Sequence, residues 1–244
     1  MKIRYDGLAA LAGSMLVCFG LPAFAQQDVT VQFTGGYTTT WANNSGDYGA
    51  GIYSATIDGQ SSPGIICDDF NDEITSGETW NATAIQASTL ASGTIGDTLF
   101  GNDPNVGLNG YAEMAELVSL MFSGGTSWGG ITGITQAELS SAIWDIGLGG
   151  TLQGLDPKAA SLVAALQLYF STNSAAAYLD TLTNLWILTP NPKDVSGEAQ
   201  EMWTENLSVP EGGAAVLYLL FAGITCFGAM FRNSRKQALR RIAV

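Results

Sequence analysis

The 244-residue chain contains no histidine. Histidine is the commonest general base near neutral pH and the commonest metal ligand in proteins. Its absence removes the usual catalytic triads and nearly all zinc and copper sites. The composition therefore argues against the common hydrolases, and we expect a protein that is not an enzyme.

Cysteine is nearly absent as well. Of the three cysteines in the chain, Cys18 and Cys226 lie in apolar stretches near the two ends, which leaves Cys67 alone between them. A single cysteine cannot form an internal disulfide, even in a compartment that would allow one.

Basic residues are scarce between the two ends. Lys158 and Lys193 are the only cations in residues 26–211, whereas 21 of the 22 acids lie there. Two cations against 21 acids give this part a net charge near −19. Such a surface repels nucleic acid and anionic lipid, so neither is an expected partner. Solubility outside the cell explains the acidity more simply than uptake of a specific cation.

The first 25 residues have the layout of a secretory signal peptide. Lys2 and Arg4 form a basic start, residues 8–21 are mostly apolar, and Ala23-Phe24-Ala25 supplies a cleavage site of the A-x-A type. This layout predicts export through the Sec translocon and cleavage by signal peptidase. The mature chain is then expected to begin near Gln26.

A long apolar run lies near the other end. Residues 214–231 form 18 positions without a charge, which as a helix span roughly 27 Å, enough to cross a bilayer. Five cations follow: Arg232, Arg235, Lys236, Arg240 and Arg241. The positive-inside rule then predicts a single transmembrane helix with a cytoplasmic tail and an exported N-terminal domain. A buried core helix is the alternative, which the basic end disfavours.

This terminal region resembles the PEP-CTERM sorting signal of exported proteins in Gram-negative bacteria. The sorting motif is Val209, Pro210 and Glu211, and the apolar run and the basic residues Arg232, Arg235 and Lys236 follow it. Gly212 replaces the usual second proline of the motif. The resemblance implies that an exosortase, a membrane-embedded transpeptidase-like enzyme, recognises residues 209–241. The protein would then pass from the inner membrane to the cell surface or an exopolysaccharide matrix; an ordinary membrane anchor is the alternative.

The part between the two terminal signals predicts one α+β domain over residues 26–190. Its first half is β-rich: residues 29–33 alternate, two further runs flank an Asp58-Gly59 turn, and residues 77–88 continue the pattern. Residues 191–208 are polar and are expected to form a connector, in which Met202-Trp203 could still pack against the domain.

The second half is expected to be helical, with a closing strand. Residues 110–124 place apolar side chains at steps of three and four. Thr135 and Glu138 form a capping box before a second helix, and Asp156 with Pro157 starts a third. A last strand is expected to end at Pro190.

Three pieces of this domain resemble the thioester-domain-like modules of bacterial surface adhesins. They are the Cys67-Asp68 pair in a strand, the helix over residues 110–124, and Ala142-Ile143-Trp144 in a helix. In true thioester domains the cysteine condenses with a glutamine two residues before the Ala-Ile-Trp sequence. Here that position is Ser140, and Gln136 lies a full helical turn earlier. The resemblance thus implies a module with Cys67 at the thioester position but without the thioester, where Cys67 is a small buried residue.

An acidic group follows Cys67 directly. Asp68, Asp69 and Asp72 are weak candidates for calcium ligands, because calcium takes six to eight oxygens. The spacing matches no EF-hand loop, and a solvated turn is the simpler interpretation. No other cofactor is expected.

Two further interpretations remain open. Tyr48, Tyr53 and Trp80 lie near glycine-rich turns and could stack on sugar rings, although packing within the sheet is the simpler role. Acid pairs such as Glu113 with Glu116 could be assigned to glycoside hydrolysis, but so acidic a chain offers many such pairs.

The sequence therefore predicts an exported surface or matrix protein with a non-catalytic structural or adhesive role. A carbohydrate- or calcium-binding module tethered to the inner membrane is the first alternative. A hydrolase acting on polysaccharide is the second.

Overall fold

The computed structural model describes residues 26–43, 46–191 and 199–207. All of them belong to one compact unit that ends at Leu207. The signal peptide, the sorting motif Val209–Glu211, the apolar run 214–231 and the basic residues Arg232, Arg235 and Lys236 lie outside the described residues. Within the described part, no helix is both long and apolar enough to cross a bilayer.

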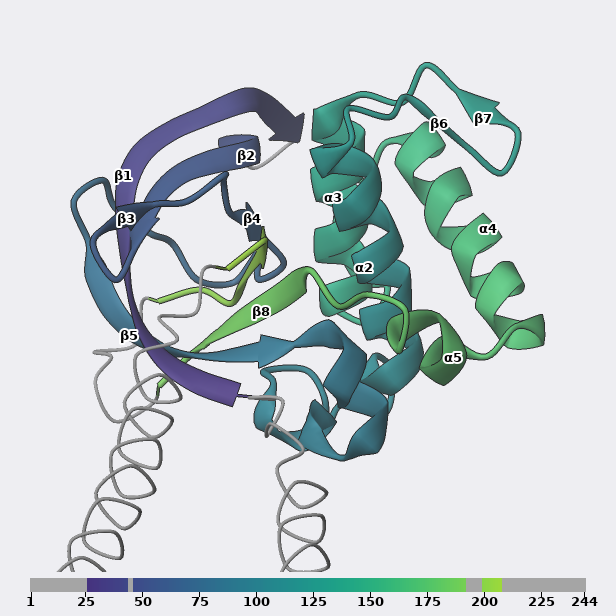
Figure 1. Cartoon of the computed structure of the whole chain (residues 1–244). Coiled ribbons are helices and arrows are strands. Elements are labelled where there is room, and N and C mark those ends of the chain that lie inside the picture. Colours follow the sequence, from purple (N-terminus) through teal and green to yellow (C-terminus); the bar gives the residue numbers. More distant parts are fainter. Residues whose placement is uncertain (1–25, 44–45, 192–198, 208–244) are drawn as a thin grey trace, which may run out of the picture. The chain divides into compact units, whose positions relative to one another are not determined.

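The described part is an α+β fold around one large antiparallel sheet (Figure 1). The order of its strands is β3-β2-β1-β5-β8-β9-β4. Their bounds are β1 Gln26–Asn43, β2 Gly46–Ile57, β3 Gln60–Ser61, β4 Ile66–Cys67, β5 Thr79–Gln86, β8 Leu185–Pro190 and β9 Met202–Glu205. A separate hairpin consists of β6 Ser127–Trp128 and β7 Ile131–Thr132.

The sheet curls strongly, and β1 in Figure 1 bends along its whole length. The pairing of β1 with β2 shifts register three times between Phe33 and Thr39. Such bulges bend a strand and increase its twist. The curl brings β2 back towards the far edge of the sheet, where Tyr53 bridges to Ile65 just before β4.

The predicted turn between β2 and β3 is confirmed. Asp58 and Gly59 have φ values of 51° and 74°, and positive φ at both central residues is the two-residue hairpin geometry that matches the twist of the strands. The Asp58 carboxylate accepts a hydrogen bond from the Thr30 amide at 2.8 Å, which ties the turn to β1.

The second half is helical, as predicted. The α-helices are α2 Gly107–Phe122, α3 Gln136–Gly147, α4 Pro157–Thr172 and α5 Ala175–Leu179, and two 3₁₀ turns, η1 Ala87–Ser92 and η2 Thr94–Asp97, precede them. The predicted capping box starts α3, with the Glu138 amide donating to Thr135 Oγ1 at 3.2 Å and the Thr135 amide donating to Glu138 Oε2. The predicted Asp156 cap and Pro157 start α4.

The core forms where the helices gather beside the curled sheet (Figure 1). The predicted inward face of α2 is fully buried, and so is the face of α3 that carries Leu139, Ala142 and Ile143. Helix α3 packs against α2 and α4 and also against β1 and β2. It therefore connects the helical half with the β-rich half.

The segment after Pro190 differs from the expected polar connector. Residues 202–205 form β9, which pairs with β8 on one side and β4 on the other. Trp203 is fully buried, and Ala199–Thr204 are all buried. The strand has only four residues, two of them polar, and its pairing with β8 and β4 shows that it belongs to the sheet.

Candidate functional site

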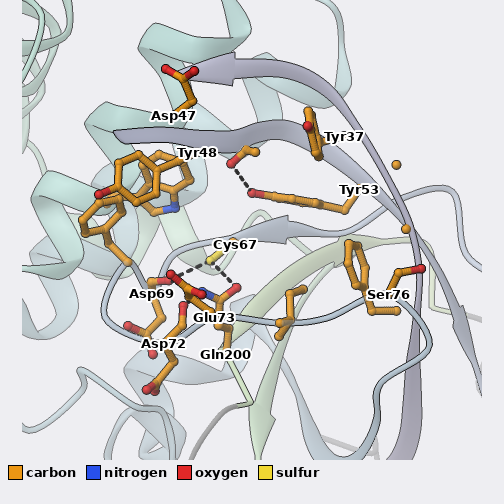
Figure 2. A pocket seen from close by; sticks show the side chains of 17 residues that line it. Tyr37, Asp47, Tyr48, Tyr53, Cys67, Asp69, Asp72, Glu73, Ser76 and Gln200 are labelled. Carbon is orange, nitrogen blue, oxygen red and sulfur yellow. Dashed lines mark hydrogen bonds between the residues drawn. The ribbon is translucent and has the colours of Figure 1, made fainter. Parts of the chain in front are cut away.

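A pocket of about 430 Å³ lies between the β1–β2 hairpin and the loop that follows β4 (Figure 2). Tyr37 and Tyr53 line it on the hairpin side, and Cys67, Asp69 and Gln200 line it on the opposite side. Its volume falls within the range of about 300–1,000 Å³ that is usual for small-molecule sites. We call it the β4-loop pocket.

Aromatic rings form much of the wall of this pocket. One group comes from three separate elements: Tyr48 on β2, Phe70 in the loop and Trp144 on α3. Their ring centroids lie 4.8 Å apart for Tyr48 and Phe70 and 5.3 Å apart for Phe70 and Trp144. On the other side, Phe33 packs edge-on against Tyr53 with centroids at 5.8 Å. The arrangement presents ring faces and edges to any occupant.

The bulged part of β1 forms one side of the pocket wall. Gly35 and Gly36 have φ values of 94° and 77°, a region that residues with a side chain rarely adopt. They line the pocket together with the neighbouring Tyr37, whose side chain is 53% exposed. Tyr37 lies over Gly49 of β2, where an added Cβ would come within 2.8 Å of the ring. The glycines therefore make room for a tyrosine at the mouth of the pocket.

Four acids also line the pocket: Asp47, Asp69, Asp72 and Glu73. Asp47 and Glu73 are exposed, Asp72 is half-buried, and Asp69 is only 3% exposed. Burial, together with the nearby charge of Asp72, raises the pKa of Asp69 to about 6, although a hydrogen bond from the Asn71 amide partly opposes the shift. Asp69 is thus mostly ionised at neutral pH.

No lysine or arginine within the described residues lines this pocket. Lys193 lies outside the described residues, and Lys158 pairs with Glu138 on α3 at 3.1 Å. Among the described residues, the four pocket acids therefore have no basic partner.

Cys67 lies at the inner side of the pocket with a free thiol and 2% exposure. Its sulfur lies 2.9 Å from the Asp69 carbonyl oxygen and 3.2 Å from Gln200 Oε1, and the single S–H donates to one of these two acceptors at a time. Burial, followed by the charges of Asp68 and Asp69, raises the pKa of the thiol well above its ordinary value. A thiol in this environment is a poor nucleophile.

The amide beside Cys67 comes from Gln200, which the sequence interpretation missed. Its Nε2 donates to the Asp69 carbonyl at 2.9 Å and to the Asp72 carbonyl. Gln200 therefore links the loop after β4 to the segment before β9 by hydrogen bonds. No local signal marks it, because 133 residues separate it from Cys67.

The two residues considered for the thioester glutamine lie elsewhere. Ser140 on α3 is buried and accepts a hydrogen bond from the Gly51 amide at 2.8 Å. Gln136 accepts one from Thr38 of β1. Both side chains join α3 to the β1–β2 hairpin.

Asp68 lies in the interior, unlike its neighbour Asp69. Asp68 Oδ2 accepts a hydrogen bond from Trp203 Nε1 at 2.6 Å, and both residues are fully buried. Asp68 Oδ1 is buried without a donor among the described residues. A proton on Asp68 Oδ1 that is donated to the carboxylate of Glu201 satisfies this oxygen.

Glu201 is the centre of this buried polar group. Its carboxylate accepts hydrogen bonds from the Tyr111 and Thr189 hydroxyls and, at 2.8 Å, from the Leu99 amide. Burial raises the pKa of Asp68 well above its ordinary value, and the charge of Glu201 raises it further. Burial also raises the pKa of Glu201, but its hydrogen bonds oppose that shift. The pair therefore favours a state with one shared proton.

The three calcium candidates do not converge. Asp68 faces Trp203 in the interior, whereas Asp69 and Asp72 line the pocket. Within the described residues, no group of three or more acids, cysteines or histidines is placed to hold a metal ion.

The other residues that the sequence singled out divide between two roles. Tyr48 and Tyr53 line the β4-loop pocket, while Trp80 is buried in β5 and does not line it. Of the acid pair on α2, Glu113 is buried, with its pKa raised to about 7 by burial, and Glu116 accepts a hydrogen bond from Trp128 Nε1 at 2.7 Å. Neither acid lines the pocket.

Comparison of the chain with protein families, with curated proteins and with solved structures finds no match in any of the three. The function therefore has to be argued from the sequence signals and from the geometry of the pocket.

Proposed function

We propose that the protein is an exported surface module that binds carbohydrate non-catalytically and thereby holds extracellular polysaccharide. The single observation that carries this proposal is the β4-loop pocket, which combines aromatic walls with carboxylates. Sugar rings present C–H faces that pack on aromatic rings, and their hydroxyls donate to carboxylates.

A binding role fits this pocket better than hydrolysis. The acids Asp69, Asp72 and Glu73 follow one another along a single loop, and Asp47 lies near the mouth on β2. Glycoside hydrolysis needs two carboxyl groups that flank one scissile bond, one of them held protonated. The one strongly buried pocket acid, Asp69, has its carboxylate engaged by the Asn71 amide.

Binding of neutral oligosaccharides tests this proposal directly. Isothermal titration calorimetry with tetramers of glucose and of N-acetylglucosamine should detect millimolar or tighter binding of at least one. Reducing-end assays should show no cleavage of either. Absence of binding by these two tetramers and by the glucosamine tetramer contradicts the proposed role, and cleavage contradicts its non-catalytic character.

The route to the surface rests on the two terminal signals. The proposal includes a signal peptide over residues 1–25, a transmembrane helix over 214–231, and recognition of Val209, Pro210 and Glu211 by an exosortase-type enzyme. The intact mass of the protein from its own cell tests this route. We expect a mass that begins near Gln26 and ends near Glu211 only when the sorting enzyme is present; a mass that retains the C-terminus in both cases makes the segment a plain anchor.

A further inference from the structure

We infer that the β4-loop pocket prefers an amino sugar with a free ammonium group over neutral and acidic sugars. This inference rests on the proposed carbohydrate-binding function and specifies the ligand of the same site. The ligand ammonium would supply the positive charge that the lining of the pocket lacks among the described residues.

The pocket carries negative charge that no described side chain compensates. Four carboxylates line the pocket, and within the described residues no basic side chain lines it. Asp69 is only 3% exposed, and no cationic side chain of the described part pairs with it. A ligand ammonium supplies that partner, and a hydrogen bond between ammonium and carboxylate is about twice as strong as one between neutral groups. A uronic acid or a sulfated sugar would add repulsion instead.

The indole N–H of Trp144 is a second feature of the pocket, independent of the acids. Trp144 is 3% exposed, lines the pocket, and has an indole Nε1–H with no oxygen or nitrogen acceptor among the described residues. The indole lies beside the Cys67 sulfur, which also lines the pocket, and a weak hydrogen bond to that sulfur partly opposes the rise that burial causes in the pKa of the thiol. Sulfur is a weak acceptor, so this buried donor is left largely unsatisfied, which is unfavourable. A ligand oxygen, such as a sugar hydroxyl, can accept from it.

The aromatic walls suit the same ligand. Tyr37, at the mouth, and Tyr48 present partly exposed rings, and a cation near an aromatic face is attracted by the negative charge of that face. A ring with hydroxyls and an ammonium group uses all three features of the pocket. A simple diamine uses only the carboxylates and the ring faces.

The test is a calorimetric titration of the full chain in a mild non-ionic detergent at neutral pH and low salt. The probes are the glucosamine tetramer, the N-acetylglucosamine tetramer, the glucose tetramer and putrescine. We expect the glucosamine tetramer to bind about tenfold more tightly than the two neutral tetramers and than putrescine. Equal affinity of the charged and neutral tetramers overturns the inference but leaves the proposed function standing, whereas no binding by any tetramer overturns both. Putrescine binding as tightly as the glucosamine tetramer also overturns the inference.

Two variants and a matched control assign the preference to the pocket. Asp69→Asn keeps an oxygen for the Asn71 amide, and the exposed Glu73→Gln is placed where it cannot disturb the core. Each should reduce the preference for the glucosamine tetramer, Asp69→Asn by about tenfold and Glu73→Gln by less. Asp180→Asn removes one exposed carboxylate outside the pocket and should leave the preference unchanged. An equal loss in Asp180→Asn means that overall charge, and not the pocket, causes the preference, which overturns the inference.

Discussion

Asp68 and Asp69 are adjacent in the chain, but they belong to two different regions of the molecule. Asp68 is fully buried against Trp203 and Glu201, with a pKa raised well above its ordinary value. Asp69 lines the pocket, and its pKa is raised only to about 6. Side chains that follow one another in an extended segment point to opposite sides. Asp68 therefore points into the interior, and Asp69 lines the pocket. The same residue type therefore stabilises the fold at one position and remains available to a ligand at the next.

The largest effect is expected for the interior acid Glu201. Glu201→Ala leaves the Tyr111 and Thr189 hydroxyls buried without this acceptor and removes the partner of the Leu99 amide. Loss of one partner in a buried polar network costs about 3–5 kcal/mol. Urea denaturation should show this loss in the free energy of unfolding. The matched pocket variant Glu73→Ala should change it by no more than about 0.5 kcal/mol; similar losses in both variants would remove the distinction between the two regions.

A second prediction uses the proton on Asp68. Its folded-state pKa lies above its unfolded value, so the folded state binds more protons and its stability falls as the pH rises. This contribution is fully present below about pH 4 and is lost as the pH rises through the folded-state pKa. Asp68→Asn keeps an acceptor for Trp203 and a donor for Glu201 but does not ionise. The free energy of unfolding of this variant should therefore decline less steeply with pH than that of the wild type.

The control for this slope is Asp180→Asn, an exposed carboxyl far from the buried pair in sequence. It should retain the wild-type slope, which includes the general repulsion among the many acids. Identical slopes for Asp68→Asn and the wild type would show that Asp68 is ionised in the folded protein.

A third prediction concerns Tyr37 in the pocket. Because its side chain is 53% exposed, Tyr37→Ala should change the free energy of unfolding by no more than about 0.5 kcal/mol. Loss of a stacking ring should weaken binding of the glucosamine tetramer about tenfold. Tyr169→Ala, which removes a 45% exposed ring of α4 outside the pocket, should leave the affinity unchanged. A drop in affinity for both variants would argue against stacking at Tyr37.

The smallest effect is expected at Cys67. Because the thiol is buried and its pKa is raised, iodoacetamide should modify Cys67 slowly in the folded protein and fully after denaturation. Peptide mapping measures both rates. A Cys67 that resists alkylation after denaturation, with loss of ammonia from Gln200, would instead reveal a thioester between these two residues.

The elements that the sequence predicted correctly are those with local signals. The Asp58-Gly59 turn, the Thr135–Glu138 capping box and the Asp156-Pro157 helix start each depend on residues within a few positions of one another. The inward faces of α2 and α3 follow from helical periodicity. These features could be read without knowledge of the tertiary structure.

The features that the sequence could not supply depend on long-range pairing. β9 has only four residues, and it is a strand because β8 and β4 lie on either side of it. That pairing also brings Gln200 to Cys67 and Glu201 to Asp68. The Gly35-Gly36 pair within an alternating run was an available signal for a bulge, and it would have directed attention to Tyr37.

The most direct test of a ligand in the β4-loop pocket is the indole N–H resonance of Trp144 in a ¹⁵N-labelled sample, assigned with Trp144→Phe. Its donor has no oxygen or nitrogen acceptor among the described residues, whereas Trp128 and Trp203 already donate to Glu116 and Asp68. Titration with the glucosamine tetramer should move the Trp144 signal downfield as a ligand oxygen accepts the bond, with the Trp128 and Trp203 signals nearly unchanged. A Trp144 signal that stays in place while the protein is saturated would contradict binding in this pocket.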